Sequence, residues 1–276
     1  MKVALVQTRT PATPPAARDH VLPLVREAAG DGAALIATPE GVNLLERDRE
    51  KLLPLLRSLD EDLVVSALRE AARDLGVSIL VGSALVRRED GKAANRQALI
   101  APSGEIVATY DKLHMFDVDL PSGESARESA TYEPGDRAVT ACAAGVRLGL
   151  SICYDLRFPV LYRALALAGA EVMTVPAAFT RPTGEAHWEV LLRARAIETG
   201  SFVLAPAQGG RHEDGRGTWG HSTVVGPWGE VLARLDHDAP GVLLAELDLA
   251  ASAKARQAIP ALRNARSFQT PEPVPA

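Results

Sequence analysis

Cysteine is scarce in this 276-residue sequence, which contains only Cys142 and Cys153. Two cysteines provide no disulfide framework, and neither belongs to a CxxC pair that would indicate a metal or redox site. The six histidines include no HExxH motif and no close pair. The sequence therefore gives no support for a metal site, and we expect none.

Long apolar runs and blocks of one charge are also missing. The apolar run in the opening "MKVALVQTRT" is too short for a signal-peptide core, and no segment approaches the roughly 18 apolar residues that span a bilayer. The net charge of −5 comes from interspersed acids and bases. We therefore expect a cytoplasmic protein that binds neither nucleic acid nor membranes.

The sequence is 47% hydrophobic, which is enough to form a large buried core. Short apolar runs alternate with longer segments of helical period, and this pattern predicts an α/β fold with a mixed sheet. We expect one domain over residues 1–268, followed by an extended, Pro-rich tail at 269–276. The expected strands are 3–7, 33–37, 77–86, two within 95–110, 146–152, 171–177, 201–207, two within 221–235, and 241–249, with helices at 16–30, 61–76, near 161–169, at 186–199 and after 249.

Three residues capable of chemistry follow predicted strands. Glu40 comes after "AALIATP", Lys112 after "EIVATYD" and Cys153 after "VRLGLSI". Because α/β sheets gather ligands beyond the carboxyl ends of their strands, these side chains can converge. Taken singly, the thiol is most simply a buried packing residue and the two charges are surface groups. Together they are a nucleophile with a base and a cation, which is how a thiol is activated.

At these positions the sequence resembles the nitrilase-like carbon–nitrogen hydrolases. The similarity lies in "PEG" (39–41), "YDKLHMFDVDLP" (110–121) and "CYDLRFP" (153–159), and it extends over essentially the whole chain except the tail. The resemblance implies a four-layer αββα sandwich and a catalytic triad of Glu40, Lys112 and Cys153. It also implies the absence of metal and organic cofactors, and assembly into homodimers or larger oligomers.

The family site contains a second glutamate, which the match of "ESATYEPGD" places at Glu128 rather than at Glu124 or Glu133. In the chemistry that we expect, Glu40 takes the thiol proton while sulfur attacks an amide carbon. Lys112 and the backbone N–H of Tyr154 stabilise the oxyanion, and Glu128 holds Lys112. Hydrolysis of the thioester then releases the acid.

Substrate-binding residues are less clearly indicated. Arg157 lies in the cysteine motif, where holding Asp155 or a nearby loop is as good an interpretation as binding substrate. His187 begins a predicted helix in a segment that, by the resemblance, borders the substrate pocket. Arg181, Arg211 and His212 lie in predicted loops and could bind a substrate carboxylate, but for each of these three a solvated loop charge is the simpler explanation. We list Arg157, Arg181, His187 and His212 as candidates. Other residues are given structural roles. We expect Trp188 and Cys142 to be packing residues. We expect the glycines at 209, 210, 215 and 217 to form a flexible loop.

Within the family, the segments "HMFDVDLP", "HWEVLLRARAIETGSFVLAPAQGGRH" and "GHSTVVGPWGEV" resemble the deaminated-glutathione amidases most. This implies hydrolysis of the terminal amide of a small carboxylate metabolite with release of ammonia. An ω-amidase acting on α-ketoglutaramate or succinamate is the alternative, since that branch shares the first and last segments. A non-catalytic interaction module on the same fold also stays open. A papain-like hydrolase would need a histidine base, for which no partner motif is present.

Overall fold

The computed structural model describes residues 1–120, 123 and 125–269. Glu124 and residues 270–276 of the expected tail lie outside this part of the chain. None of the helices among the described residues is long and apolar enough to cross a membrane.

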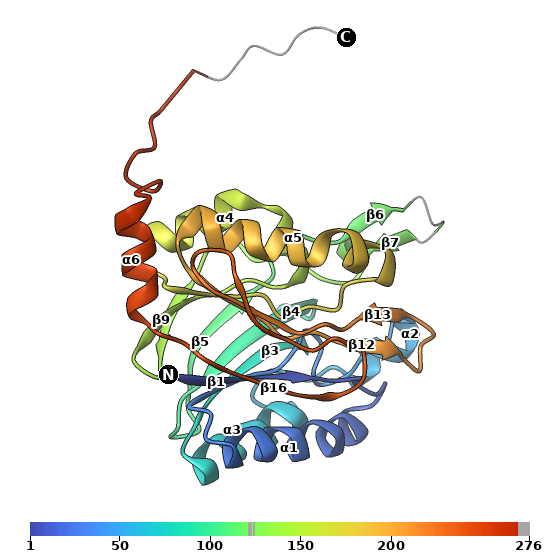
Figure 1. The fold of residues 1–276 in the computed structure, drawn as a ribbon. Coiled ribbons are helices and arrows are strands. Elements are labelled where there is room, and N and C mark those ends of the chain that lie inside the picture. Colours follow the sequence, from blue (N-terminus) through green and yellow to red (C-terminus); the bar gives the residue numbers. More distant parts are fainter. Residues whose placement is uncertain (121–122, 124, 270–276) are drawn as a thin grey trace, which may run out of the picture.

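The fold consists of four layers, as the family resemblance implies (Figure 1). Helices α1 (Pro14–Gly30) and α3 (Leu63–Leu75) cover the outer face of one sheet. Helices α4 (Pro159–Leu167) and α5 (Arg181–Thr199) cover the outer face of the other. The two sheets pack against each other between these helical layers, so the αββα prediction is confirmed.

The first sheet has six strands in the order β16-β1-β2-β3-β4-β5. Strands β1, β2 and β3 run parallel, and the others join the sheet antiparallel. The strand bounds are Lys2–Gln7 for β1, Leu35–Ala37 for β2, Ser78–Arg87 for β3, Ala93–Ile100 for β4, Ile106–Asp111 for β5 and Gly241–Glu246 for β16. Strand β16 comes from near the C-terminus and therefore ties the end of the domain to its beginning.

The second sheet repeats this plan in the order β15-β14-β11-β10-β9-β8. Its parallel strands are β9, β10 and β11, and the remaining pairs are antiparallel. The strand bounds are Thr140–Ala143 for β8, Val146–Gly149 for β9, Val172–Thr174 for β10, Phe202–Ala205 for β11, Thr223–Val225 for β14 and Val231–Arg234 for β15. Both sheets thus have parallel strands at their centre, and apart from β16 the first sheet comes from the N-terminal half of the chain and the second from the C-terminal half.

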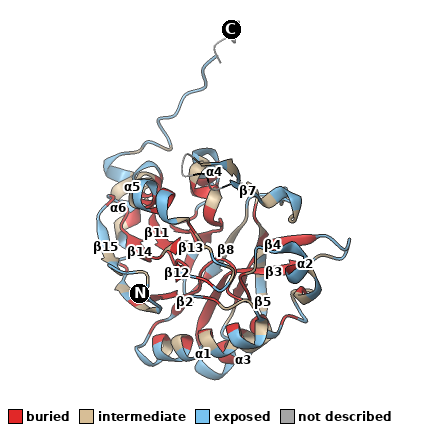
Figure 2. Cartoon of the chain, turned by 90° about the vertical axis from the view of Figure 1, so that its right-hand side faces the viewer, coloured by how far each residue is buried: buried red, intermediate tan, exposed pale blue. Residues whose placement is uncertain are grey.

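Side-chain alternation explains how one strand serves two cores. On β1, Val3 and Leu5 pack into the core between the sheets, whereas Ala4 and Val6 pack against the helix layer. Successive side chains of a strand point to opposite faces, so a strand that is buried on both faces reads as a continuous apolar run. Figure 2 shows the result: buried residues fill the sheets and the inward faces of the helices.

Helix α3 shows how local sequence sets the boundaries of an element. Its N-cap residue Asp62 accepts hydrogen bonds from the N–H groups of Val64 and Val65 at 3.0 and 2.9 Å. Gly76 ends the helix in the left-handed conformation with φ of +68°, which glycine adopts without strain. The Gly76 cap that the sequence predicts is therefore confirmed. The remaining helical elements are α2 (Arg49–Leu52), α6 (Ala250–Ala258) and the 3₁₀ turns η1 (Leu53–Leu55), η2 (Glu128–Ala130) and η3 (Cys153–Arg157).

Several predicted elements differ from the structure. The strand expected over 146–152 ends at Gly149, and the helix expected from residue 186 begins at Arg181, with Pro182 in its first turn. The glycine-rich segment is not a flexible loop but the hairpin β12 (Gly209–Arg211) and β13 (Gly217–Trp219). A second hairpin, β6 (Asp117–Asp119) with β7 (Ser125–Arg127), was not foreseen. Cys142 is exposed on β8, so its assignment to packing is wrong, whereas Trp188 is buried as expected.

Gly82 on β3 lies beneath the loop that leads to Glu40. A Cβ atom there would lie 1.8 Å from the carbonyl oxygen of Thr38 and 2.6 Å from that of Pro39. We therefore expect Gly82→Ala to lower the free energy of unfolding by about 1–3 kcal/mol, measured by urea denaturation. Gly30→Ala is the matched control, because a Cβ at Gly30 has nothing within 4 Å. Equal stability of the two variants would contradict the close approach at Gly82.

Candidate active site

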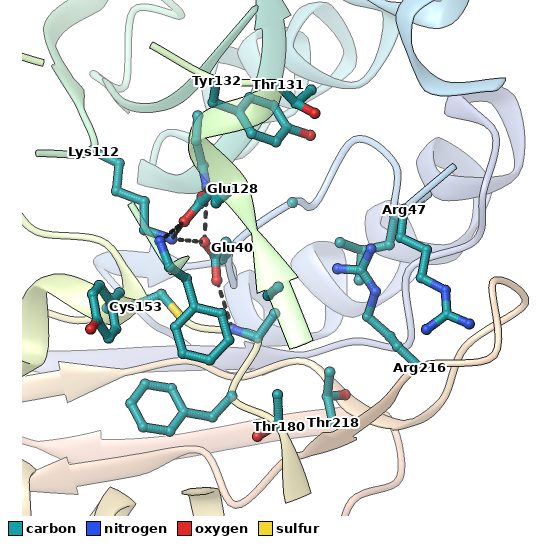
Figure 3. A pocket seen from close by; sticks show the side chains of 18 of the residues that line it. Glu40, Arg47, Lys112, Glu128, Thr131, Tyr132, Cys153, Thr180, Arg216 and Thr218 are labelled. Atoms are coloured by element: carbon teal, nitrogen blue, oxygen red, sulfur yellow. Dashed lines mark hydrogen bonds and ion pairs between the residues drawn. The ribbon is translucent and has the colours of Figure 1, made fainter. Parts of the chain in front are cut away.

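Glu40, Lys112 and Cys153 reach one cavity of about 370 Å³ from the ends of three strands (Figure 3). Glu40 follows β2, Lys112 follows β5 directly, and Cys153 lies four residues beyond Gly149, the last residue of β9. The first two strands belong to one sheet and the third to the other. The packing of two sheets face to face therefore brings together side chains that are far apart in sequence.

Both oxygens of the Glu40 carboxylate are held in place. Oε1 accepts hydrogen bonds from Lys112 Nζ at 2.9 Å and from Asn95 Nδ2 at 2.8 Å. Oε2 accepts the backbone N–H of Ala178 at 2.9 Å, and the Cys153 thiol hydrogen-bonds to the same carboxylate. Glu40 is only 7% exposed, so these contacts take the place of water.

The ammonium group of Lys112 lies between two carboxylates. Its Nζ is 2.9 Å from Glu40 Oε1 and 2.9 Å from each oxygen of Glu128. The Glu128 carboxylate is fixed in turn by the backbone N–H of Phe116, at 2.6 Å from Oε2. Of the acids that compete for this position, Glu133 pairs instead with Lys92 at 2.6 Å, and Glu124 lies outside the described residues. Among the described residues, Glu128 is thus the acid of this segment that contacts Lys112.

Cys153 is placed by a strained turn. Its φ is +50°, a conformation that is uncommon for residues other than glycine, and its N–H donates to Pro176 O at 2.9 Å. The segment that follows is the 3₁₀ turn η3, and the α-helix begins only at Pro159. Tyr154 is the second residue of this turn, where backbone N–H groups have no partner within the helix. Its N–H can therefore serve a ligand.

Asp155 joins the segment of Lys112 to the segment of Cys153. Its Oδ2 accepts hydrogen bonds from Tyr110 Oη at 2.7 Å and from the N–H of Ile152 at 2.9 Å. Its Oδ1 lies 2.7 Å from His114 Nδ1 and also accepts the His114 N–H. Arg157 takes no part in these contacts, so Asp155 is held without it.

The pKa values of the three groups diverge. Burial alone would raise the pKa of Glu40, but the Lys112 charge and hydrogen bonds from Cys153, Lys112 and Asn95 outweigh it and lower the pKa. Burial and then the Glu40 charge raise the pKa of Cys153 well above its ordinary value. Burial opposes the charge of Lys112, yet Glu128 and Glu40 raise its pKa. At neutral pH the site therefore holds a carboxylate base, a protonated thiol and an ammonium group.

The candidate substrate-binding residues separate into two groups. Arg157 lines the cavity, with its guanidinium 5.9 Å from the ring centroid of Tyr154 and 5.4 Å from that of Phe179. The other three do not line it. His187 is exposed and lies 3.2 Å from Arg157, while Arg181 forms an ion pair with Asp238.

His212 is buried away from the cavity and is 2.7 Å from Thr218 Oγ1. Burial lowers its pKa to about 4, so His212 is neutral at neutral pH. Its position suits it to hold the β12–β13 hairpin against Thr10, whose carbonyl oxygen lies 3.4 Å from His212 Nδ1. Neither His212 nor Arg181 lines the cavity.

Sequence reasoning missed several residues of the cavity. Asn95 lies inside a predicted strand. The only sequence signal that its side chain points inward is the alternation of side chains along that strand. Arg47 and Arg216 lie in loops, where no periodicity predicts direction. The remaining polar residues that line the cavity include Glu46, Arg127, Thr131, Tyr132, Thr180, Thr183 and Thr218.

The sequence of residues 2–257 matches the family model described as carbon–nitrogen hydrolase. The chain belongs to this family. The human deaminated glutathione amidase is 43% identical over 249 residues, covering 88% of this chain and 75% of its own. The aligned region includes the segments that carry Glu40, Lys112 and Cys153, because the alignment covers 88% of this chain.

Solved structures of family members share the fold. The C. elegans NitFhit protein superposes with a TM-score of 0.89 at 31% identity, over 96% of this chain and 65% of its own, so this chain spans about two thirds of that protein. An amidase from Nesterenkonia sp. AN1 superposes with a TM-score of 0.79 at 29% identity, over 94% of each chain. In that structure of a mutant amidase, the acetamide moiety of fluoroacetamide is attached covalently at the active-site cysteine.

The raised pKa of Cys153 can be tested directly. Because a thiol is protonated below its pKa, we expect no thiolate from Cys153 in the free protein up to pH 9.0, the ordinary value. The measurement is the ultraviolet absorbance of thiolate during a pH titration, with the Cys153→Ala spectrum subtracted to remove Cys142. Glu40→Gln removes a negative charge beside the sulfur, so its thiolate should appear at lower pH than in wild type. Thiolate absorbance of wild type at neutral pH would contradict the assignment.

Proposed function

We propose that this carbon–nitrogen hydrolase is an amidase whose substrate is deaminated glutathione and whose nucleophile is Cys153. The observation that carries the proposal is the hydrogen-bonded cluster of Glu40, Lys112 and Cys153 at the inner end of one cavity. The name of the human relative, 43% identical to this chain, supports the choice of substrate. No metal or organic cofactor has a part in the mechanism.

In the first half of the reaction, the sulfur of Cys153 attacks the amide carbonyl carbon while Glu40 takes the thiol proton. The charge that develops on the carbonyl oxygen is stabilised by Lys112 Nζ and by the N–H of Tyr154, each well-placed donor contributing about 3–4 kcal/mol. Glu40 then delivers its proton to the amide nitrogen. The carbon–nitrogen bond breaks, the amine departs and the acyl group remains on Cys153 as a thioester.

In the second half, Glu40 takes a proton from a water molecule that attacks the thioester carbon. The same two donors stabilise the second oxyanion, and Glu40 returns the proton to the sulfur as the carbon–sulfur bond breaks. The carboxylic acid leaves and the thiol is restored. Glu128 acts as a positioning residue, because its contacts with Nζ hold Lys112 in place and keep it charged.

The leaving group depends on the amide. In deaminated glutathione the amide nitrogen belongs to the cysteinyl residue, so hydrolysis releases α-ketoglutarate and cysteinylglycine rather than ammonia. Ammonia is the product only for a primary amide such as α-ketoglutaramate. The expectation of ammonia release is thus correct for an ω-amidase and needs this correction for the preferred substrate.

Two alternatives are weaker. An ω-amidase would use the same cluster of side chains and differ only in the substrate. A non-catalytic interaction module would have no need of a buried ammonium between two carboxylates, which is costly to desolvate. We also propose that residues 1–268 form one catalytic domain and that the protein is cytoplasmic.

The nucleophile and base can be tested by substitution. We expect Cys153→Ala to abolish turnover of deaminated glutathione, and Glu40→Gln to lower kcat by at least about 10²-fold, because the thiol loses its general base. Release of α-ketoglutarate and of cysteinylglycine is followed together, beside ammonia release from α-ketoglutaramate. Mass spectrometry of quenched wild-type reactions should detect the α-ketoglutaryl group on Cys153.

Cys142→Ala is the matched control and should retain full activity, because Cys142 is exposed on β8. A preference for α-ketoglutaramate would keep the mechanism but change the proposed substrate. Full activity of Cys153→Ala, or no turnover of any amide by wild type, would overturn the proposed function.

We further propose that the protein forms a homodimer through the outer helical layer of the second sheet. Exposed apolar side chains gather on these elements, and surfaces of this kind commonly mark contacts between chains. Val160 and Leu167 lie on α4, Val190 and Ile197 lie on α5, and the C-terminal segment after α6 adds Ile259 and Phe268. Light scattering during size-exclusion chromatography should give about twice the mass of one chain, and Val190→Asp with Ile197→Asp should give the mass of one. A wild-type monomer at micromolar concentration would contradict this proposal.

A further inference from the structure

Two arginines lie at the end of the cavity that is remote from the nucleophile. Arg47 belongs to the loop between Glu40 and α2, and Arg216 belongs to the turn of the β12–β13 hairpin. Figure 3 shows both guanidinium groups across the cavity from Cys153. The two residues are neighbours, since Arg47 Nη2 is 3.7 Å from the position that a Cβ at Gly215 would occupy.

The guanidinium of Arg216 is held in a fixed position with donors to spare. Its Nε donates to Asp214 Oδ2 at 2.7 Å, while its backbone N–H donates to Oδ1 of the same carboxylate at 3.0 Å. The Asp214 side chain is only 1% exposed, whereas that of Arg216 is 27% exposed. A single contact to Nε leaves the terminal nitrogens of Arg216 for another acceptor. Among the described residues, no acidic side chain forms an ion pair with Arg47.

We propose that Arg47 and Arg216 bind the carboxylate at the far end of the leaving group, and so select amides whose amine part ends in a carboxylate. This inference rests on the proposed function. Guanidinium groups bind carboxylates through paired, charge-assisted hydrogen bonds, and two of them that face one cavity provide donors from two directions. In deaminated glutathione the bound group is the carboxylate of the glycyl residue.

The position of Glu40 indicates which side of the scissile amide bond faces Arg47 and Arg216. Glu40 must reach the amide nitrogen to protonate it, and the chain runs from Glu40 directly to Glu46 and Arg47, which line the same cavity. The leaving amine therefore lies along this loop. Arg157 belongs instead to the segment that carries Cys153, and its guanidinium lies beside the ring of Tyr154.

Exposure supports the same assignment. Arg47 is an exposed residue at the opening of the cavity, whereas Cys153 is 8% exposed at its inner end. The amine must leave before water can attack the thioester, whereas the acyl group stays attached until the second step. A binding site near solvent suits the fragment that departs first.

The experiment compares two substrates that differ in one group: deaminated glutathione and its C-terminal carboxamide. We expect wild type to have a kcat/KM for the acid about 10–100-fold higher than for the carboxamide, because a charge-assisted contact is lost in the latter. The double variant Arg47→Gln with Arg216→Gln should hydrolyse both at the lower rate. The matched control is Arg211→Gln. Arg211 is an exposed residue of the same hairpin that does not line the cavity, so this variant should preserve the preference for the acid over the carboxamide.

A third substrate, α-ketoglutaramate, separates this inference from the proposed function. Its leaving group is ammonia, so its hydrolysis should be the same in wild type and in the double variant. An equal loss of activity on all three substrates would overturn the inference and assign the arginines to the acyl side or to the fold. Equal rates of wild type on the acid and the carboxamide would also overturn it while leaving the proposed function intact. No hydrolysis of any of the three by wild type would overturn the proposed function, and this inference with it.

Discussion

The site depends on one interaction, the contact of the Lys112 ammonium with the carboxylates of Glu40 and Glu128, at 2.9 Å from each. The Lys112 side chain is 2% exposed, so its charge would be very costly without both partners. One carboxylate balances the cation and the other leaves a negative charge beside the thiol. The same arrangement that makes burial of Lys112 tolerable therefore provides the base and keeps Cys153 protonated until a substrate arrives.

The two-sheet architecture is what makes this contact possible. Glu40 and Lys112 come from one sheet and Cys153 from the other, so the site exists only where the sheets are packed. Asp155 strengthens the junction, because its four hydrogen bonds reach Tyr110 on β5, His114 in the segment after β5, and Ile152 before Cys153. A buried carboxylate whose oxygens all have hydrogen-bond partners makes a rigid connection between these segments and does not destabilise the core.

Sequence predicted the parts of the structure that are set by local patterns. Short apolar runs indicated most strands of both sheets, and the positions of Glu40, Lys112 and Cys153 after three of these strands together indicated an activated thiol. Boundaries were missed where tertiary contacts decide them: β9 stops at Gly149 because the chain must then turn, with φ of +50° at Cys153. Cys142 looked like packing because its neighbours are apolar, but β8 is an edge strand with one face toward solvent. Arg47 and Arg216 were missed because no sequence pattern predicts where loop side chains point.

The division of charge along the cavity follows from these separate origins. The inner end is formed by strand ends and carries two carboxylates around one ammonium, whereas the outer end is formed by a loop and a hairpin turn and carries two arginines together with Glu46. In the binding mode that we propose, the two outer arginines hold the carboxylate of the leaving group, and the amide lies toward Cys153. In this mode the outer loop and hairpin turn orient the substrate, and the buried cluster performs the chemistry. Substitutions in the loops can therefore alter the preferred amide while the buried cluster stays unchanged.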